Sequence, residues 1–310
     1  MSDKEMSVSE DLGSMDRSRL IKGTLITLLG GAFWGANGTL TKYLMDTYAV
    51  DPLWLVCVRE LGSCWFFLAT AYFVDRKRLK SAASSSRTML NILLIGIGGI
   101  LFNNVAYLEA IDYTNSATAT VMQSLNILVI LGWTALVYKQ KPSLREGIGI
   151  CLALVGTYLI TTGGDYTQLK LPPEGIFWGF MTTISSALLL VLAKNLLEKY
   201  GSLVFNGFAM LFSGIAFSLY VQPWNAMPEL DATGIALVWV SIIAGTYGAY
   251  ALFMHGIKEI GSMRGSMMGT VEPIVALATS VIFLGASFSI AEIIGFILVM
   301  IMVVLTAKND

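Results

Sequence analysis

The sequence predicts an all-α integral membrane protein with about ten transmembrane helices, arranged as two inverted repeats of five helices. Three observations lead to this fold class. The composition is too apolar for a soluble domain, one segment of the chain repeats at a constant spacing, and the loop charges alternate in sign along the chain.

Composition indicates a membrane protein because the chain of 310 residues is 55% hydrophobic and only 13% charged. Its mean hydropathy is +0.69, whereas a soluble domain normally has about 25% charged residues. Crossing the roughly 30 Å of hydrocarbon in a bilayer takes about 20 largely apolar residues per helix. The predicted spans are residues 23–44, 53–74, 89–110, 117–137, 147–161, 175–196, 203–221, 233–255, 266–284 and 290–306.

An internal repeat divides the chain into two halves. Residues 111–160 align without gaps with residues 257–306, at an offset of 146 positions. The basic loop 138–141 of the first copy is matched by the uncharged loop 284–287 of the second, so we expect the copies to lie in opposite orientations. In a membrane, an inverted repeat is the usual architecture of a secondary transporter, whose substrate site lies where the halves meet. Identical residues in the copies include Ser116 and Ser262, Met122 and Met268, Glu146 and Glu292, and Gly149 and Gly295.

The loop charges predict the same orientation independently of the repeat. Basic clusters precede the first span and follow the second, fourth and sixth, while the alternate loops are mainly acidic. Positive loops stay in the cytoplasm, so both termini are expected there, with the chain in the inner (plasma) membrane of the cell. Because each half has an odd number of spans, the second half must enter inverted. The expected units are a disordered cytoplasmic tail over 1–20, a first repeat over 21–161, an extracytoplasmic linker over 162–174 and a second repeat over 175–310.

Several classes of function are disfavoured by the residues that the chain lacks. The sequence has a single histidine, His255, and its three cysteines all fall inside predicted spans, so neither a metal site nor a disulfide framework is expected. No glycine-rich phosphate loop is present, which argues against an ATP-driven pump. We therefore expect no cofactor and no nucleic-acid partner. A membrane-embedded enzyme is disfavoured because the sequence shows no cluster of catalytic side chains at a membrane face.

Several motifs resemble the drug/metabolite transporter superfamily, specifically the EamA-type ten-helix exporters, in which each half is a five-helix EamA repeat. The resemblance covers about residues 21–308 and implies export of a small metabolite. Two departures stand out: Tyr138 and Lys139 replace a common Gly-Glu pair, and Ile127 replaces a typical proline of the fourth span. The matching residues are 33–37 (Phe-Trp-Gly-Ala-Asn), Lys42, Arg59, 104–107 (Asn-Val-Ala-Tyr), 112–117, 271–274 (Val-Glu-Pro-Ile) and 292–295.

Charged side chains at membrane depth are candidates for function, since each costs at least about 2.5 to 3.5 kcal/mol there. Glu272 lies beside Pro273 in the ninth span, and its repeat partner is Asn126. It is the candidate contact for a coupling proton or cation; the alternative is a carboxylate neutralised against a neighbouring helix. Arg59 is expected to tie to a loop or to the lipid interface, with substrate contact as the alternative. Lys42 can reach the outer interface, and its role stays open.

Aromatic and amide side chains in the spans indicate the class of substrate. Such groups on facing helices would give a cavity with stacking surfaces and hydrogen-bonding groups but few fixed charges. This suits an amino acid or a related metabolite. The alternatives are interfacial belts for the aromatic residues, and a passive facilitator or a multidrug or lipophilic-cation exporter of the same fold. The predicted substrate-binding residues are Trp34, Asn37, Asn104, Tyr107, Gln123, Asn126, Ser186, Tyr247, Tyr250 and Met268.

Overall fold

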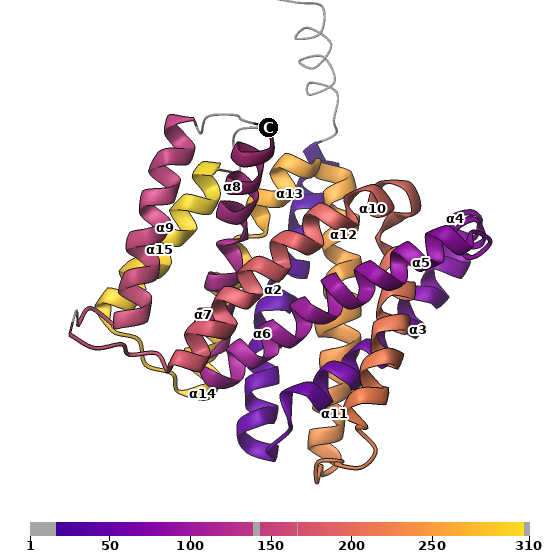
Figure 1. The fold of residues 1–310 in the computed structure, drawn as a ribbon, viewed down its shortest axis with the longest axis horizontal. Coiled ribbons are helices and arrows are strands. Elements are labelled where there is room, and N and C mark those ends of the chain that lie inside the picture. The colour runs from indigo at the N-terminus through magenta and orange to yellow at the C-terminus, as the bar shows by residue number, and fades with distance from the viewer. Residues whose placement is uncertain (1–16, 139–142, 166, 307–310) are drawn as a thin grey trace, which may run out of the picture.

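The computed structural model describes residues 17–138, 143–165 and 167–306, and within these ranges the chain is helical with no β-strand (Figure 1). Most of the predicted tail over 1–20 lies outside the described residues, as does Lys139. The helices of the first half are α2 (Arg17–Tyr48), α3 (Pro52–Val74), α4 (Arg76–Ala83), α5 (Ser86–Ile95), η1 (Gly96–Leu101), α6 (Phe102–Tyr113), α7 (Ser116–Ser124), α8 (Asn126–Tyr138) and α9 (Leu144–Thr162). Those of the second half are α10 (Pro173–Val221), α11 (Ala232–Val240), η2 (Ser241–Gly248), α12 (Ala249–Ile260), α13 (Ser262–Met268), α14 (Val271–Leu284) and α15 (Ile290–Thr306).

The lengths of these helices fit a membrane. Six described helices are long and apolar enough to cross a bilayer, and α14 and α15 are shorter apolar helices. The 49-residue α10 bends back at Gly201, whose φ of 79° lies in a region that glycine adopts at little cost. With α10 divided there, the described residues make ten passes: α2, α3, α5–α6, α7–α8, α9, the two arms of α10, α11–α12, α13–α14 and α15.

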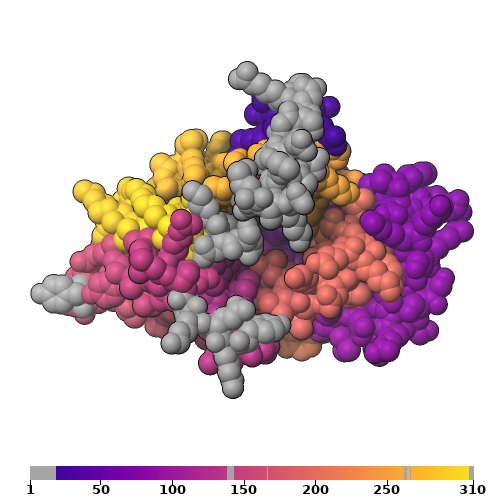
Figure 2. Space-filling view, turned by 90° about the horizontal axis from the view of Figure 1, so that it is seen from above, coloured from indigo at the N-terminus to yellow at the C-terminus, as the bar shows by residue number. Residues whose placement is uncertain are grey.

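The repeat is inverted in space, as α9 and α15 show most directly. These related helices lie side by side at one edge of the molecule (Figure 1), and they run antiparallel because Gly149 lies against Thr306 while Gly156 lies against Gly295. Seen from above, this pair (magenta and yellow) and the α3–α5 region (purple) occupy opposite flanks of the molecule (Figure 2).

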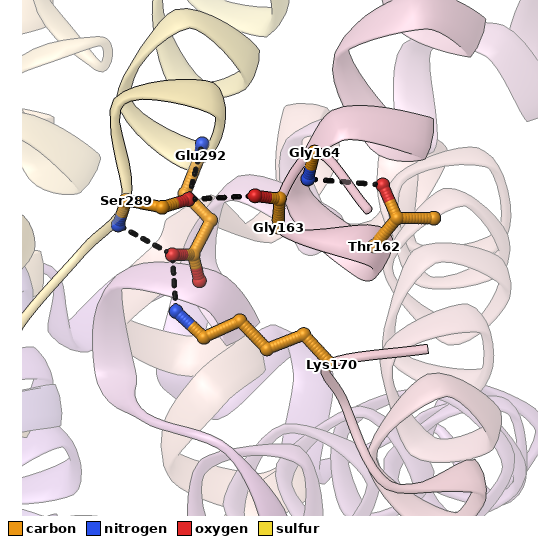
Figure 3. Close-up of polar contacts among 6 residues, drawn as sticks. All are labelled: Thr162, Gly163, Gly164, Lys170, Ser289 and Glu292. Atoms are coloured by element: carbon orange, nitrogen blue, oxygen red, sulfur yellow. Dashed lines mark hydrogen bonds and ion pairs between the residues drawn. The ribbon is translucent and has the colours of Figure 1, made fainter. Parts of the chain in front are cut away.

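Both of these helices begin with the same local motif. At the start of α9, the Ser143 hydroxyl accepts from the backbone N–H of Glu146, whose carboxylate accepts from the Ser143 N–H. Ser289 and Glu292 repeat this capping box at the start of α15, at the opposite end of the pair (Figure 3). Each box satisfies two backbone donors that a helix start leaves without partners.

The first helix of each half packs against the other half. The α2 helix lies along α12 and α14 of the second half, and at its start Arg19 pairs with Glu259 near the end of α12. In the same way the first arm of α10 lies against the first half, where the Thr183 hydroxyl donates to the carbonyl of Met122 at 2.7 Å. This exchange of first helices buries the seam between the repeats.

Irregular helical segments occur at matching positions in the two halves. The third pass of each half contains a π-helical segment, η1 in the first and η2 in the second, and the 146-residue offset places one over the other. The fourth pass of each half is interrupted, at Leu125 between α7 and α8 and at residues 269–270 between α13 and α14. Irregularities of this kind inside membrane helices are found where backbone or side chains line a cavity.

Candidate functional site

The two helix interruptions place polar side chains at the centre of the molecule. Asn126 is the first residue of α8 and Glu272 is the second residue of α14, each directly after its break. Both line one cavity of about 160 Å³ to which each half contributes walls. The lining residues are Thr120, Gln123, Ser124, Asn126, Ile127, Gly269, Thr270, Glu272, Met300 and Val303.

The carboxylate of Glu272 makes no hydrogen bond and no ion pair with any side chain among the described residues. Its position in the first turn of α14 is favourable, because the amino end of a helix carries partial positive charge. Gly35 of α2 packs against the backbone carbonyl of Glu272. The carboxyl group is therefore held on a tightly packed backbone with its oxygens free to bind a proton or a cation.

Two amides of the first half complete the polar wall. The Gln123 Nε2 donates to Thr182 Oγ1 at 3.3 Å, and the Asn126 Nδ2 donates to Ser186 Oγ at 2.9 Å. Both partners belong to the first arm of α10. These bonds orient the amides and leave their carbonyl oxygens without a hydrogen bond among the described residues, so the oxygens are available to a ligand.

An aromatic group adjoins the polar wall. The Trp34 ring meets the Tyr250 ring edge to face at 4.9 Å and also packs on Phe253, with the ring centres 5.0 Å apart. The Tyr107 hydroxyl shares a hydrogen bond with Thr120 Oγ1 at 2.8 Å. Tyr107 and Tyr250 both lie within electrostatic range of Glu272. The structure thus brings several predicted residues from both halves to the same region.

Other predicted residues have different surroundings. Asn37 is 5% exposed and lines a separate apolar cavity of about 540 Å³ between α2, α11, η2 and α14. Asn104 donates to the Glu60 carboxylate at 2.9 Å, and Tyr247 shares a 2.6 Å hydrogen bond with Thr70. Met268 ends α13, and its backbone carbonyl faces α2. None of these four residues is among those that line the polar cavity.

The adjacent charges on α3 have separate partners. Glu60 is 1% exposed and accepts hydrogen bonds from Asn104 and from Ser213 Oγ, the latter at 2.6 Å. Arg59 Nε donates to Thr246 Oγ1 at 3.2 Å on η2. Neither charged group forms an ion pair among the described residues.

Two contacts fix the position of Lys42 near the carboxyl end of α2. Its ammonium group donates to the backbone carbonyl of Asp112 at 2.7 Å and pairs with Asp46 at 3.0 Å. These contacts join α2 to the end of α6, which gives Lys42 a structural role in this conformation.

A family model places the chain among known proteins. The EamA-like transporter family matches residues 21–162 and again residues 173–308. The chain belongs to the EamA-like transporter family. The all-helical, two-repeat membrane fold predicted from the sequence is therefore confirmed, and so is the resemblance to the drug/metabolite transporter superfamily.

Relatives of this EamA-like transporter include an uncharacterized inner membrane transporter, YicL, of Salmonella typhimurium, which is 26% identical over 93% of this chain and 96% of its own length. The uncharacterized transporter YyaM of Bacillus subtilis is 25% identical over 92% of this chain and 93% of its own. A GDP-fucose transporter of Caenorhabditis elegans is 21% identical over 79% of this chain and 70% of its own. One solved crystal structure has the same fold, with a TM-score of 0.64 and 17% identity over 91% of this chain and 95% of that one.

Sequence reasoning missed the residues that orient the polar wall. Thr120 and Thr182 carry small hydroxyl groups, which occur throughout the predicted spans, so nothing marked them as part of a site. The repeat offers a signal for Thr120 alone, because the 146-residue offset aligns it with Ser266, another hydroxyl residue. The π-helical segments leave no such signal, because their sequences are ordinary apolar runs with glycine.

Proposed function

We propose that this EamA-like transporter is a secondary transporter that exports a small metabolite, most simply an amino acid or a related compound, from the cytoplasm. The halves formed by residues 21–161 and 175–310 rock about the polar cavity, exposing it alternately to the two sides of an inner membrane, with both termini cytoplasmic. The location of the cavity at the seam of two inverted repeats supports this mechanism.

The observation that carries the proposal is the unpartnered Glu272 at the break between α13 and α14. An ionised carboxylate without a partner is costly inside a membrane, so binding a proton favours the closed states in which the cavity is shielded from water. Opening to a less acidic side releases the proton. Proton binding and release at Glu272 would therefore couple substrate movement to the proton gradient.

A second candidate is an exporter of lipophilic cations. An unpaired carboxylate within electrostatic range of Tyr250, which packs on the Trp34 ring, is also the chemistry that binds an organic cation. In this case the cation and the proton would compete for Glu272. A passive facilitator, by contrast, has no use for a titrating group.

The test is transport by the full chain in proteoliposomes with an imposed pH gradient. Radiolabelled L-leucine and a labelled lipophilic cation, tetraphenylphosphonium, serve as probes, and Glu272→Gln is compared with the wild type. The variant keeps the side-chain shape but cannot release a proton, so we expect at least tenfold slower gradient-driven transport and loss of its pH dependence.

Glu229→Gln is the matched control, because Glu229 is an exposed carboxylate in the loop before α11. It should leave both probes unaffected. If Glu272→Gln transports at the wild-type rate with the wild-type pH profile, Glu272 has no coupling role. If the wild type equilibrates both probes without concentrating either, the protein is a facilitator.

A further inference from the structure

Arg59 stands out as a permanent charge inside the membrane that forms no ion pair among the described residues. It lies seven residues after Pro52, the first residue of α3, which is about 10 Å along the helix from its outer end. Its single hydrogen bond runs from Nε to Thr246 Oγ1. The guanidinium has five N–H donors, so most of its donors have no partner among the described residues.

The neighbouring carboxylate of Glu60 does not fill this gap. Adjacent positions on a helix point about 100° apart, and Glu60 is directed at α6 and α10, where it accepts from Asn104 and Ser213. No ion pair joins Glu60 to Arg59 among the described residues. A guanidinium remains charged at any physiological pH, so its cost cannot be relieved by losing a proton.

The contacts of the Arg59 side chain show that it points toward the interior of the molecule. Thr246 belongs to η2, where its hydroxyl donates to the Ser241 carbonyl at 2.9 Å, five residues back, and so presents its oxygen to Arg59. Tyr107 interacts electrostatically with both Arg59 and Glu272, and its hydroxyl is hydrogen-bonded to Thr120, which lines the polar cavity. The partly buried guanidinium and the unpartnered carboxylate therefore flank the same interior region.

We propose that Arg59 binds the anionic group of the substrate, an oxyanion such as a carboxylate or a phosphate. Thr246 anchors Nε and sets the plane of the guanidinium, which leaves its terminal nitrogens to form two parallel hydrogen bonds with the oxyanion. The substrate then supplies the missing negative charge, and a neutral analogue leaves the cation unbalanced. This inference rests on the proposed transport function and specifies the substrate class.

The experiment measures equilibrium binding to the full chain in lipid nanodiscs by calorimetry and thermal shift. The probes are L-leucine, 4-methylpentanoate, L-leucinamide and inorganic phosphate, of which only leucinamide lacks an oxyanion. For the wild type we expect either the two carboxylates or phosphate to bind at least tenfold more tightly than leucinamide. Preference for carboxylates or for phosphate identifies the source of the oxyanion.

Arg59→Gln should abolish this preference, and Arg59→Lys, which keeps the charge but loses the planar fork, should retain only part of it. Arg87→Gln, at an exposed cytoplasmic position of α5, is the control and should bind like the wild type. Because Arg59→Gln could fail to fold, modification of the wild type by phenylglyoxal gives a second readout by mass spectrometry. Bound oxyanion should slow modification of Arg59 and leave that of Arg87 unchanged.

The inference is overturned if no oxyanion probe binds more tightly than leucinamide, or if Arg59→Gln keeps the wild-type preference. It is also overturned if ligand binds without protecting Arg59. These results are separate from those of the transport assay: Glu272→Gln can abolish coupling whether or not Arg59 selects the anion, and selective binding can persist if coupling fails.

Discussion

Single buried polar residues hold the interior of this transporter together. The Glu60 carboxylate joins three passes, since it lies on α3 and accepts from Asn104 on α6 and from Ser213 on α10. Arg59 and Glu60 have separate partners because adjacent side chains on a helix point about 100° apart. The identity of those partners could not be predicted, since Asn104, Ser213 and Thr246 lie 44, 153 and 187 residues away.

The first prediction concerns Ser213→Ala. This change removes a donor from a fully buried carboxylate, and a hydrogen bond to a charged group contributes about 1.5 to 3 kcal/mol. We expect a clearly lower midpoint of thermal unfolding in nanodiscs. Ser84→Ala removes a hydroxyl of the same kind from an exposed helix end and should leave the midpoint unchanged. Equal midpoints for the two variants would show that Glu60 does not depend on Ser213.

Whole helices were easier to predict than their irregularities. The ten spans follow from runs of apolar residues, because hydropathy is a local property of the chain. The break at Leu125 has no local cause such as a proline, since residues 123–127 contain none. The structure explains it by long-range contacts: Thr183 donates to the Met122 carbonyl, and Asn126 is bonded to Ser186 of the same α10 arm. A break made by a neighbouring helix cannot be predicted from the sequence of the broken one.

Close approach of α2 to α14 leads to the second prediction. An added methyl group at Gly35 would collide with the Glu272 carbonyl and with the backbone of Ala276. Overpacking of this kind costs typically about 1 to 3 kcal/mol, so Gly35→Ala should lower the unfolding midpoint and slow transport by displacing Glu272. In the same assays Gly132→Ala, a helical position with no atom near the added methyl, should behave like the wild type. Wild-type stability and transport in Gly35→Ala would contradict the tight α2–α14 contact.

At the scale of the molecule, the linker between the halves, residues 162–174, also holds the two halves together. Lys170 pairs with Glu292 at 2.5 Å, and the Ser289 hydroxyl donates to the Gly163 carbonyl at 3.1 Å, so the linker is clamped onto the start of α15 (Figure 3). Glu292 is 3% exposed there, while it also caps its own helix. One carboxylate thus serves both the helix start and the connection between repeats.

The inverted arrangement leads to the last prediction, which concerns the two faces of the membrane. Ser143 lies at the start of α9 and Ser287 lies in the loop before α15, and both residues are exposed. Because α9 and α15 pack antiparallel, the two residues lie at opposite ends of this helix pair. In a Cys151→Ala background, whose remaining cysteines Cys57 and Cys64 are buried, Ser143→Cys and Ser287→Cys are treated with a membrane-impermeant maleimide on intact cells. Because the basic loop before α9 is expected in the cytoplasm, Ser287→Cys should be labelled at once and Ser143→Cys only after the cells are opened.

Labelling of both on intact cells would place the two ends on one face, which an antiparallel pair of membrane-spanning helices does not allow. The reverse pattern would keep the inverted fold but turn the molecule over, which would contradict the orientation predicted from the loop charges.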